Sequence, residues 1–248
     1  MTVQRPLGSE MTEEQHRKEQ AYSKTIRDAE AETVRDILSK NRTPEGLANL
    51  IKNAAGFAEA KTNKDRPPDN PAVACKPGCN WCCYQNVLVS APEVFRIVRF
   101  VKSEMSASMA SKVSDRLHKL DRRTRGTSKK RRADLHLPCA FLDQGRCTIY
   151  AVRPLACAEF TSFNVDDCKR AQRQGFPMGS VIHEKIGMIV YRGVMQGLFE
   201  GLGQALPGSD TAPLELTAAV VSVLNKHDAE QSWLDGTDIF ADAHLGQG

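Results

Sequence analysis

The chain has 248 residues, of which 41% are hydrophobic and 26% are charged, and its formal net charge is +4. With no long low-complexity tract, this composition favours a folded soluble protein. No segment offers the ~18 consecutive apolar residues of a membrane-spanning helix. No apolar stretch follows Arg5, as it would in a secretory signal. These features exclude a membrane partner and predict a cytoplasmic protein, and the net charge is too mild to imply a polyanionic partner on its own.

The first 70 residues predict two helices and a linker. Apolar side chains recur at helical spacing in the first helix, at Tyr22, Ile26, Val34, Ile37 and Leu38. The second helix is expected to begin at Pro44, with Thr43 as its N-cap. Its predicted buried stripe consists of Leu47, Leu50, Ile51, Ala54 and Phe57. A polar linker over residues 61–70 follows, so residues 1–70 are expected to be an N-terminal helical extension with its linker.

All eight cysteines lie between residues 75 and 168, and they form two groups. The first group is the run Cys75-Lys-Pro-Gly-Cys79-Asn-Trp-Cys82-Cys83, and the second comprises Cys139, Cys147, Cys157 and Cys168. In a reducing cytosol such clustering indicates metal ligation rather than disulfides. Neighbouring cysteines also fit disulfide geometry poorly. We therefore expect a thiolate site for zinc or an iron–sulfur cluster, with all eight cysteines as candidate ligands.

The local sequence around the first group predicts how its thiols converge. Pro77-Gly78 is a turn former that would bring Cys79 back toward Cys75. Cys82 and Cys83 are expected to diverge because neighbouring side chains point apart. Either one member of that pair lies behind the ligands, or the eight thiols serve more than one metal. Cys83 and Cys168 are the two cysteines that could lie behind the ligands. Two four-cysteine zinc sites would use every cysteine, whereas a polynuclear cluster would leave some over.

Helices are predicted between the two cysteine groups. Residues 87–89 suggest a short strand, and Ser90-Ala-Pro-Glu93 has the pattern of a capping box. The helix that it opens would bury Val94, Ile97, Val98 and Val101. A further helix would carry Met109, Val113, Leu117 and Leu120 on one face and end at Gly126. Residues 116–132 contain nine Lys and Arg residues against one acid, Asp121, and we interpret this run as a solvated helix end and loop.

The second cysteine group lies in a loop-rich stretch, and helices are predicted after it. A core helix over residues 181–202 contains Gly193, Gly197 and Gly201, whose spacing would let a neighbouring helix approach closely. A last helix is expected over residues 213–227, and residues 241–248 are expected to fray. The predicted fold class is mainly α, with helices packed around an irregular, loop-rich cysteine-cluster segment. Residues 71–178 would form the metal-binding domain, and residues 179–248 would pack on its core.

Other polar residues near the cysteines are assigned supporting parts. Arg153 is expected to offset the charge of the thiolates, and Trp81 and Tyr150 are expected to cover the site. His136 and His183, the latter within the 181–202 helix, are interpreted as ordinary polar residues, because eight thiols need no histidine. Four acidic residues are expected to pair with Arg146, Arg153 or Lys169. They are Asp143, Glu159, Asp166 and Asp167.

Four sequence blocks carry a family resemblance. CKPGCNWCC, PCAFLD, CTIYAVRPLAC and the segment that begins at Cys168 occur in this order. Together they resemble the YkgJ-type cysteine-cluster family, a zinc- or iron-chelating domain with a CxxCxxCC signature. The resemblance covers Cys75 to about Pro177. Two departures are the three-residue first spacing and Ala158, where relatives carry arginine. The resemblance implies metal binding rather than any one reaction.

Metal binding, as zinc or an iron–sulfur cluster, is therefore the predicted function. One alternative is an iron–sulfur-dependent enzyme, either redox or S-adenosylmethionine-dependent. Cys75-x3-Cys79-x-Trp81-Cys82 has the spacing of the radical S-adenosylmethionine signature, but the expected run of alternating strands and helices is missing. Some relatives of the resembled family are regarded as protein lysine methylases. A second alternative is a zinc-stabilised nucleic-acid-binding module using residues 116–132, which we do not favour because no aromatic residues are interleaved. We assign no catalytic residue, and the sequence leaves the question of enzyme activity and any protein partner open.

Overall fold

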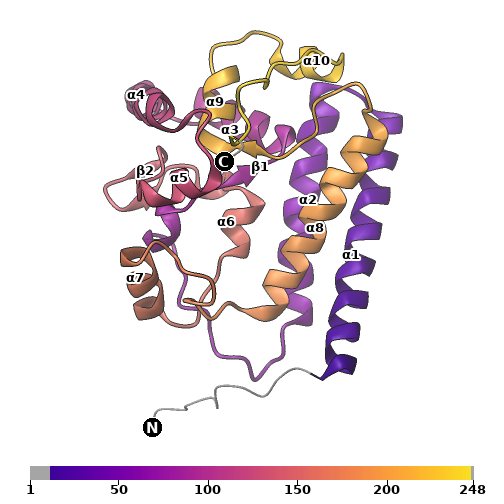
Figure 1. Cartoon of the computed structure of the whole chain (residues 1–248). Coiled ribbons are helices and arrows are strands. Elements are labelled where there is room, and N and C mark those ends of the chain that lie inside the picture. Colours follow the sequence, from indigo (N-terminus) through magenta and orange to yellow (C-terminus); the bar gives the residue numbers. More distant parts are fainter. Residues whose placement is uncertain (1–11, 247–248) are drawn as a thin grey trace.

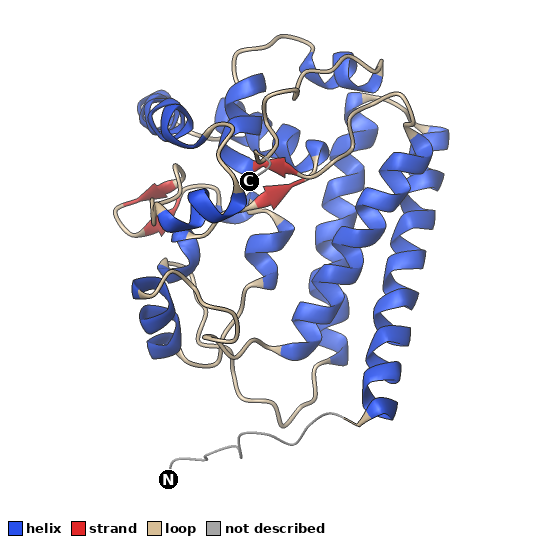
Figure 2. Ribbon diagram, in the orientation of Figure 1, coloured by secondary structure: helices blue, strands red, loops and turns tan. Residues whose placement is uncertain are grey.

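Three long helices lie side by side along one flank of the molecule (Figure 1). They are α1 (Glu13–Lys40), α2 (Pro44–Asp65) and α8 (Lys185–Ala205). The computed structural model describes residues 12–246, and within this range it has ten α-helices and only two-residue strands. Figure 2 shows that helices and loops make up nearly all of the fold. The prediction of a mainly α protein is confirmed.

Helix α2 begins as predicted but continues further than expected. The Thr43 hydroxyl accepts a hydrogen bond from the Gly46 amide at 3.2 Å, which is the expected cap. The helix then extends to Asp65, so the first half of the predicted linker is helical and the loop starts at Arg66. The ion pair between Lys61 and Asp65, 2.6 Å apart and one turn away from each other, supports this extension. Phe57 is 39% exposed, contrary to the predicted stripe, because the buried face of α2 continues through Ala58 instead.

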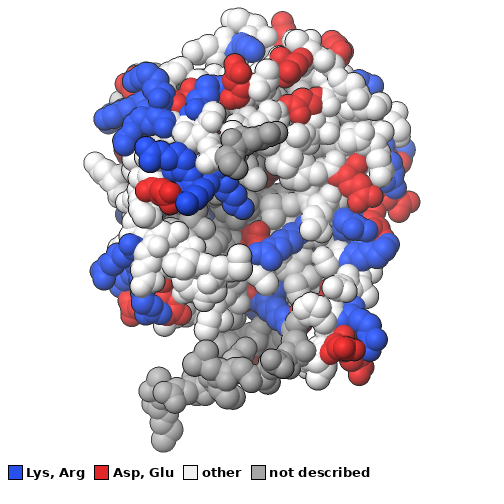
Figure 3. All heavy atoms as spheres, in the orientation of Figure 1, with Lys and Arg blue, Asp and Glu red and all other residues white. Residues whose placement is uncertain are grey.

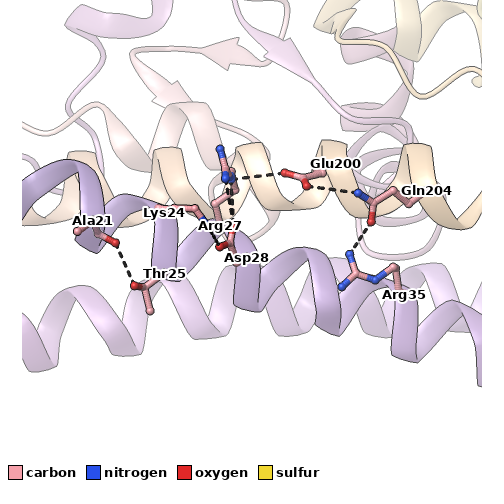
Figure 4. Close-up of polar contacts among 8 residues, drawn as sticks. All are labelled: Ala21, Lys24, Thr25, Arg27, Asp28, Arg35, Glu200 and Gln204. Atoms are coloured by element: carbon pink, nitrogen blue, oxygen red, sulfur yellow. Dashed lines mark hydrogen bonds and ion pairs between the residues drawn. The ribbon is translucent and has the colours of Figure 1, made fainter.

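Helix α8 approaches α1 through its three spaced glycines. A Cβ atom at Gly197 would lie 2.3 Å from the carbonyl oxygen of Arg27, and one at Gly201 would lie 2.6 Å from the Cβ of Val34. Polar contacts flank this tight seam, including Arg27 Nε at 3.5 Å from Glu200 and a hydrogen bond from Arg35 to Gln204 (Figure 4). The close approach predicted from the glycine spacing is confirmed.

Substitution of Gly197 by alanine should destabilise the protein by about 1–3 kcal/mol, because overpacking a tight contact forces backbone shifts. The matched control is Gly203→Ala on the same helix, where the nearest atom to a new Cβ would be 3.6 Å away. That change should be neutral or stabilise by up to about 1 kcal/mol, since alanine favours helix over glycine. Urea unfolding of both variants measures the difference. Equal midpoints for the two would contradict the tight packing of α1 on α8.

Glu30 lies in the same seam and should make stability depend on pH. Its side chain is 4% exposed, and burial raises its pKa to about 7 from an ordinary value of 4.5. The folded state therefore holds this proton more tightly than the unfolded chain does. The contribution of Glu30 to stability should be complete below pH 4.5 and be lost as pH rises through 7, by about 3 kcal/mol.

The variant Glu30→Gln should remove this contribution, because an amide does not ionise. Urea unfolding at pH 5 and at pH 8 measures it in the wild type and in the variant. Glu32→Gln, at an exposed position of the same helix, is the control and should keep the wild-type pH dependence. A wild-type stability that rises between these two pH values in a Glu30-dependent way would contradict the assignment.

The chain between α2 and α8 forms the other flank of the molecule. It starts with the cysteine-containing 3₁₀ turn η1 (Trp81–Tyr84) and continues through short elements. In order these are β1 (Leu88–Val89), α3 (Ala91–Ser103), α4 (Ala107–Thr124), α5 (Lys129–Asp134), β2 (Leu142–Asp143), β3 (Arg146–Cys147), η2 (Tyr150–Val152), α6 (Leu155–Glu159) and α7 (Val165–Arg173). The predicted strand at residues 87–89, the capping box of α3 and the helix that ends before Gly126 are all present.

Two small antiparallel ladders tie this flank together. Strand β2 pairs with β3, and β1 pairs with β4 (Leu214–Glu215) from the C-terminal part of the chain, with Leu88 opposite Glu215. After β4 come α9 (Leu216–Val223) and α10 (Ala229–Leu234), the second of which the sequence patterns did not predict. The main apolar cluster extends from Ile26 of α1 to Ala243, so helices from both ends of the described chain share one core with the cysteine segment.

The C-terminal segment is ordered where it was expected to fray. Ala243 is buried, and its carbonyl oxygen accepts a hydrogen bond from the amide of Glu215 at 2.7 Å. The Gly246 amide donates to the Thr127 carbonyl at 2.9 Å, which holds the segment against the loop before α5. The expectation of fraying is therefore wrong for residues 241–246, while 247 and 248 lie outside the described residues. Among residues 12–246, no helix has the length and apolarity required to span a bilayer.

Candidate metal centre

The first cysteine group is shaped by two consecutive turns. The Cys79 amide donates to the Lys76 carbonyl at 2.9 Å, which closes a β-turn with Gly78 at φ +91°. A positive φ at the third turn position favours glycine, so the Pro-Gly pair has the expected effect. The 3₁₀ turn η1 follows at once and carries both Cys82 and Cys83. The two tight turns thus keep the backbone of this group compact, so that its four cysteines lie close together.

Separate contacts bring the second cysteine group to the first. The Cys139 amide donates to the Cys83 carbonyl at 2.7 Å, which joins the two groups directly. The β2–β3 hairpin then returns Cys147 to the same region, opposite Leu142. Cys157 lies on α6, whose first amide, that of Leu155, donates to the carboxylate of Glu93 at 2.8 Å. Glu93 therefore links the position of Cys157 to helix α3. The sequence patterns did not predict this role of Glu93.

Six of the eight cysteines line one cavity of about 70 Å³, together with Tyr150 and Arg153. These six are Cys79, Cys82, Cys83, Cys139, Cys147 and Cys157. The expectation that neighbouring Cys82 and Cys83 diverge is wrong, because the 3₁₀ turn directs both toward the same cavity. The space is far below the ~300 Å³ of a typical organic-ligand pocket. It is of a size that suits a metal ion.

The remaining two cysteines meet at Ser162. The Ser162 amide donates to the sulfur of Cys75 at 3.3 Å, and Ser162 also lies beside Cys168 on α7, where it opposes the effect of burial on the pKa of that thiol. Cys75 and Cys168 interact electrostatically with each other and with Cys79 and Cys82. These electrostatic interactions divide the thiols into two neighbouring sets of four, and Cys82 interacts with members of both. The first set is Cys75, Cys79, Cys82 and Cys168, and the second is Cys83, Cys139, Cys147 and Cys157.

Burial governs the proton affinity of most of these thiols. It raises the pKa of Cys139 to about 12, and it also raises the pKa of Cys147. Hydrogen bonds from the backbone amides of Phe141 to Cys139 and of Ile149 to Cys147 act in the opposite direction, because they favour the thiolates. The Cys83 thiol hydrogen-bonds to Cys82, which lowers the pKa of Cys82 to about 7 and raises that of Cys83. Burial also raises the pKa values of three further thiols, Cys75, Cys157 and Cys168. A buried thiol of this kind becomes a thiolate readily only when a cation is bound beside it.

Two arginines lie beside the thiols. Arg153 interacts electrostatically with Cys82, Cys147 and Cys157, in the place predicted for it, and its guanidinium lies 4.6 Å from the centre of the Tyr150 ring. Arg132 was expected to be solvated, but it is only 2% exposed and lies beside Cys139. The reason is a buried carboxylate, Glu215, whose oxygen is 3.9 Å from Arg132 Nε. The sequence of the basic run does not show that Arg132 is buried, because its partner Glu215 is distant in sequence.

The predicted acidic pairs around the site are mostly different from those observed. Asp166 pairs with Lys169 at 2.8 Å, as expected. The other three acids contact arginines outside the predicted set: Asp143 with Arg116, Glu159 with Arg192, and Asp167 with Arg170. Each of these partners lies on a neighbouring helix or within one turn of the acid, so local geometry rather than the thiolates determines the pairing.

The histidines and aromatic residues take peripheral places. His183 lies in the loop before α8 rather than inside the predicted helix, with Nδ1 3.0 Å from the Thr161 carbonyl oxygen. Neither His183 nor His136 lines the cysteine cavity. Trp81 packs against the small apolar cluster that contains Cys168. Tyr150 borders the cavity but remains 38% exposed, so it covers the site only in part.

The basic run has a mixed character. Three of its nine cations are used within the fold: Arg116 contacts Asp143, Arg125 contacts Asp121, and Arg132 is buried. The other six are exposed, at Lys119, Arg122, Arg123, Lys129, Lys130 and Arg131. Figure 3 shows Lys and Arg side chains gathered over α4 and α5 on the face that it displays.

The cysteines share a cavity without forming a closed ligand set. Within residues 12–246, no group of three or more Cys, His, Asp or Glu side chains has an arrangement that could hold a metal ion. The chemistry of the donors nevertheless fits a thiophilic cation, because the buried thiols face one space beside two arginines.

Comparison with known proteins gives one match. Residues 74–175, which contain all eight cysteines, match the model of the CxxCxxCC family, described as "Putative zinc- or iron-chelating domain". No curated protein and no solved structure matches the chain. The family match confirms the resemblance inferred from the four sequence blocks and supports chelation of zinc or iron by this segment.

Proposed function

We propose that this chain is a metal-binding protein that holds zinc or an iron–sulfur cluster through its clustered cysteines. The observation that carries the proposal is the single cavity of about 70 Å³ that six cysteines line. The remaining two, Cys75 and Cys168, lie beside Ser162 and interact electrostatically with Cys79 and Cys82, which line the cavity. The match of residues 74–175 to a zinc- or iron-chelating domain supports the same function.

The surroundings of the thiols suit an anionic metal centre. Several thiolates on one cation carry excess negative charge, which buried cations and backbone amides offset. Arg153 and Arg132 are the cations here, and the amides of Phe141 and Ile149 are the donors. Rotation of cysteine side chains between staggered rotamers would bring the sulfurs onto a bound ion. A bound cation would also lower the thiol pKa values that burial has raised.

The two sets of thiols favour two adjacent sites of four cysteines each. One set comprises Cys75, Cys79, Cys82 and Cys168, and the other comprises Cys83, Cys139, Cys147 and Cys157. Cys82 lies where the sets meet. This division uses every cysteine and requires no histidine. A bound zinc would supply stability to the loop-rich segment, whereas an iron–sulfur cluster would supply electron transfer.

The deciding experiment measures metal and acid-labile sulfide, with a visible spectrum, on protein purified without oxygen. Zinc with no colour and no sulfide would identify structural thiolate sites. Iron with stoichiometric sulfide and a brown colour would identify an iron–sulfur cluster and would favour the redox or S-adenosylmethionine-dependent enzyme alternative. Protein that is free of both metals, and that gains neither on reconstitution, would contradict the proposal.

The basic run gives weaker support to nucleic-acid binding. Arg132, which a simple neutralisation of residues 129–132 would include, is buried beside Glu215. A clean test therefore changes Lys129, Lys130 and Arg131 to glutamine and leaves Arg132 intact. Salt-sensitive binding of duplex DNA or RNA that this triple variant loses would establish the alternative.

A further inference from the structure

A second, larger cavity adjoins the cysteine cavity. It has a volume of about 490 Å³ and lies between α2, α3, α6, α8 and the turn η2. Two side chains, Tyr150 and Arg153, line both cavities. Its volume falls in the range of about 300–1,000 Å³ that is common for small-molecule sites. The space is therefore large enough for an organic ligand, which the cysteine cavity is not.

Positive charge dominates the lining of this cavity. Lys52, Arg96 and Arg153 line it, against one acid, Glu59. Among the described residues, none of these three cations forms an ion pair with a carboxylate or a side-chain hydrogen bond, and Arg153 contacts the Tyr150 ring and interacts electrostatically with the thiols of the neighbouring cavity. The cations of the cavity are thus available to a ligand.

Arg96 is the most informative of the three cations because it is half-buried. Burial lowers its pKa, and Glu93, one turn earlier on α3, opposes that shift. Both oxygens of Glu93 are already occupied: one accepts from the Ser90 amide and hydroxyl, and the other from the Leu155 amide. A half-buried guanidinium that faces a cavity and has no hydrogen bond within the fold can donate two parallel hydrogen bonds to an anion with paired oxygens.

The sides of the cavity are aromatic. Tyr191 of α8 interacts electrostatically with Arg153, Glu59 and Tyr150, which places the four groups around one space. On α2, a Cβ atom added to Gly56 would meet nothing within 4 Å, so the cavity is open along that helix. The combination of paired cations, aromatic walls and an open side is typical of sites for small organic acids.

We propose that this cavity binds a small organic anion, a carboxylate or a phosphate ester, with its acidic group between Arg96 and Arg153. Because Arg153 also borders the cysteine cavity, the bound anion would lie next to the metal centre. That adjacency rests on the proposed function, whereas the anion binding itself does not. The site makes the chain a candidate for chemistry on, or sensing of, a small acid at a metal centre.

Calorimetric titration of the full chain, purified with its metal, tests the site. The probes are succinate and inorganic phosphate at low ionic strength, with neutral succinamide as the comparison ligand. Heat released with one probe and not the other distinguishes a carboxylate site from a phosphate site. Arg96→Gln should weaken binding by about tenfold or more, because it removes charge-assisted hydrogen bonds. Gly56→Leu should fill part of the cavity, since its Cβ atom would meet nothing within 4 Å.

The matched control is Arg122→Gln, an exposed arginine on α4 that is remote from the cavity lining, and it should bind as the wild type does. Circular dichroism verifies that each variant is folded, and metal content is measured on the same samples. Metal-loaded protein that binds neither probe, or that binds them unchanged in Arg96→Gln and Gly56→Leu, would overturn the anion site and leave the metal centre standing. Protein that gains neither zinc nor iron on reconstitution, but binds succinate through Arg96, would support the anion site and contradict the proposed metal function.

Discussion

Replacement of Cys82 by serine should remove more metal than replacement of any other single cysteine. Cys82 lies where the two thiol sets meet, so its loss weakens both. Cys168→Ser should release only the metal of the set that contains Cys75, and Cys157→Ser only that of the set that contains Cys83. Metal content per chain, measured by mass spectrometry of the desalted variants, gives the result directly.

Double variants provide the internal control for this prediction. Residues within one set should show non-additive losses, because the first substitution has already emptied the site. Cys75→Ser combined with Cys168→Ser should therefore lose no more metal than either change alone. Cys75→Ser combined with Cys157→Ser should lose the metal of both sets. Equal loss in all of these variants would indicate one polynuclear centre instead of two sites, and unchanged metal in Cys82→Ser would contradict the ligand assignment.

Local sequence patterns predicted the features that depend on a few neighbouring residues. The Thr43 cap, the Ser90–Glu93 capping box and the Pro77-Gly78 turn all have the expected geometry. The glycine spacing of α8 likewise predicted a close helix contact, although not that α1 would provide it. In each case the pattern lies within a few neighbouring residues or along one face of a single helix. That is why the sequence alone sufficed.

Features that depend on distant partners were missed or misinterpreted. Arg132 is buried because Glu215, far along the chain, accompanies it. The C-terminal segment is ordered because Ala243 and Gly246 bond to Glu215 and Thr127. The cysteine clustering predicted that thiols would lie close together, and six of them line one cavity, but the larger cavity beside them could not be predicted. Its lining comes from four helices and a turn whose packing no local pattern specifies.

The division of the chain at residues 70 and 178 stays a prediction. Its physical basis was the polar segment before the first cysteine and the end of the family-like region. The shared apolar cluster from Ile26 to Ala243 shows why the segments on either side would not separate easily. The metal-binding segment is loop-rich, and the helices before and after it supply most of the apolar surface that it packs on. We therefore expect the metal site to form only when the contacts between this core and the cysteine segment hold the thiols in place.

Glu93 is the residue that carries this coupling, and its removal should have the largest effect on stability of any single substitution considered for this fold. Its buried carboxylate accepts hydrogen bonds from the Ser90 amide at 2.7 Å, the Ser90 hydroxyl at 2.8 Å and the Leu155 amide at 2.8 Å. Glu93→Ala would leave these buried donors without partners. The free energy of unfolding should fall by about 3–5 kcal/mol, as measured in urea.

The same substitution should also act on the metal centre in a selective way. Glu93 caps the start of α6, which carries Cys157, but it has no contact with the Ser162 cluster of Cys75 and Cys168. Metal should therefore be lost from the set that contains Cys157 before the other set. Glu32→Ala, at an exposed site on α1, is the control and should change neither stability nor metal content appreciably. A Glu93→Ala protein with wild-type stability, or with equal metal loss from both sets, would show that α3 does not position α6, and that the thiols are held in place by their own loops.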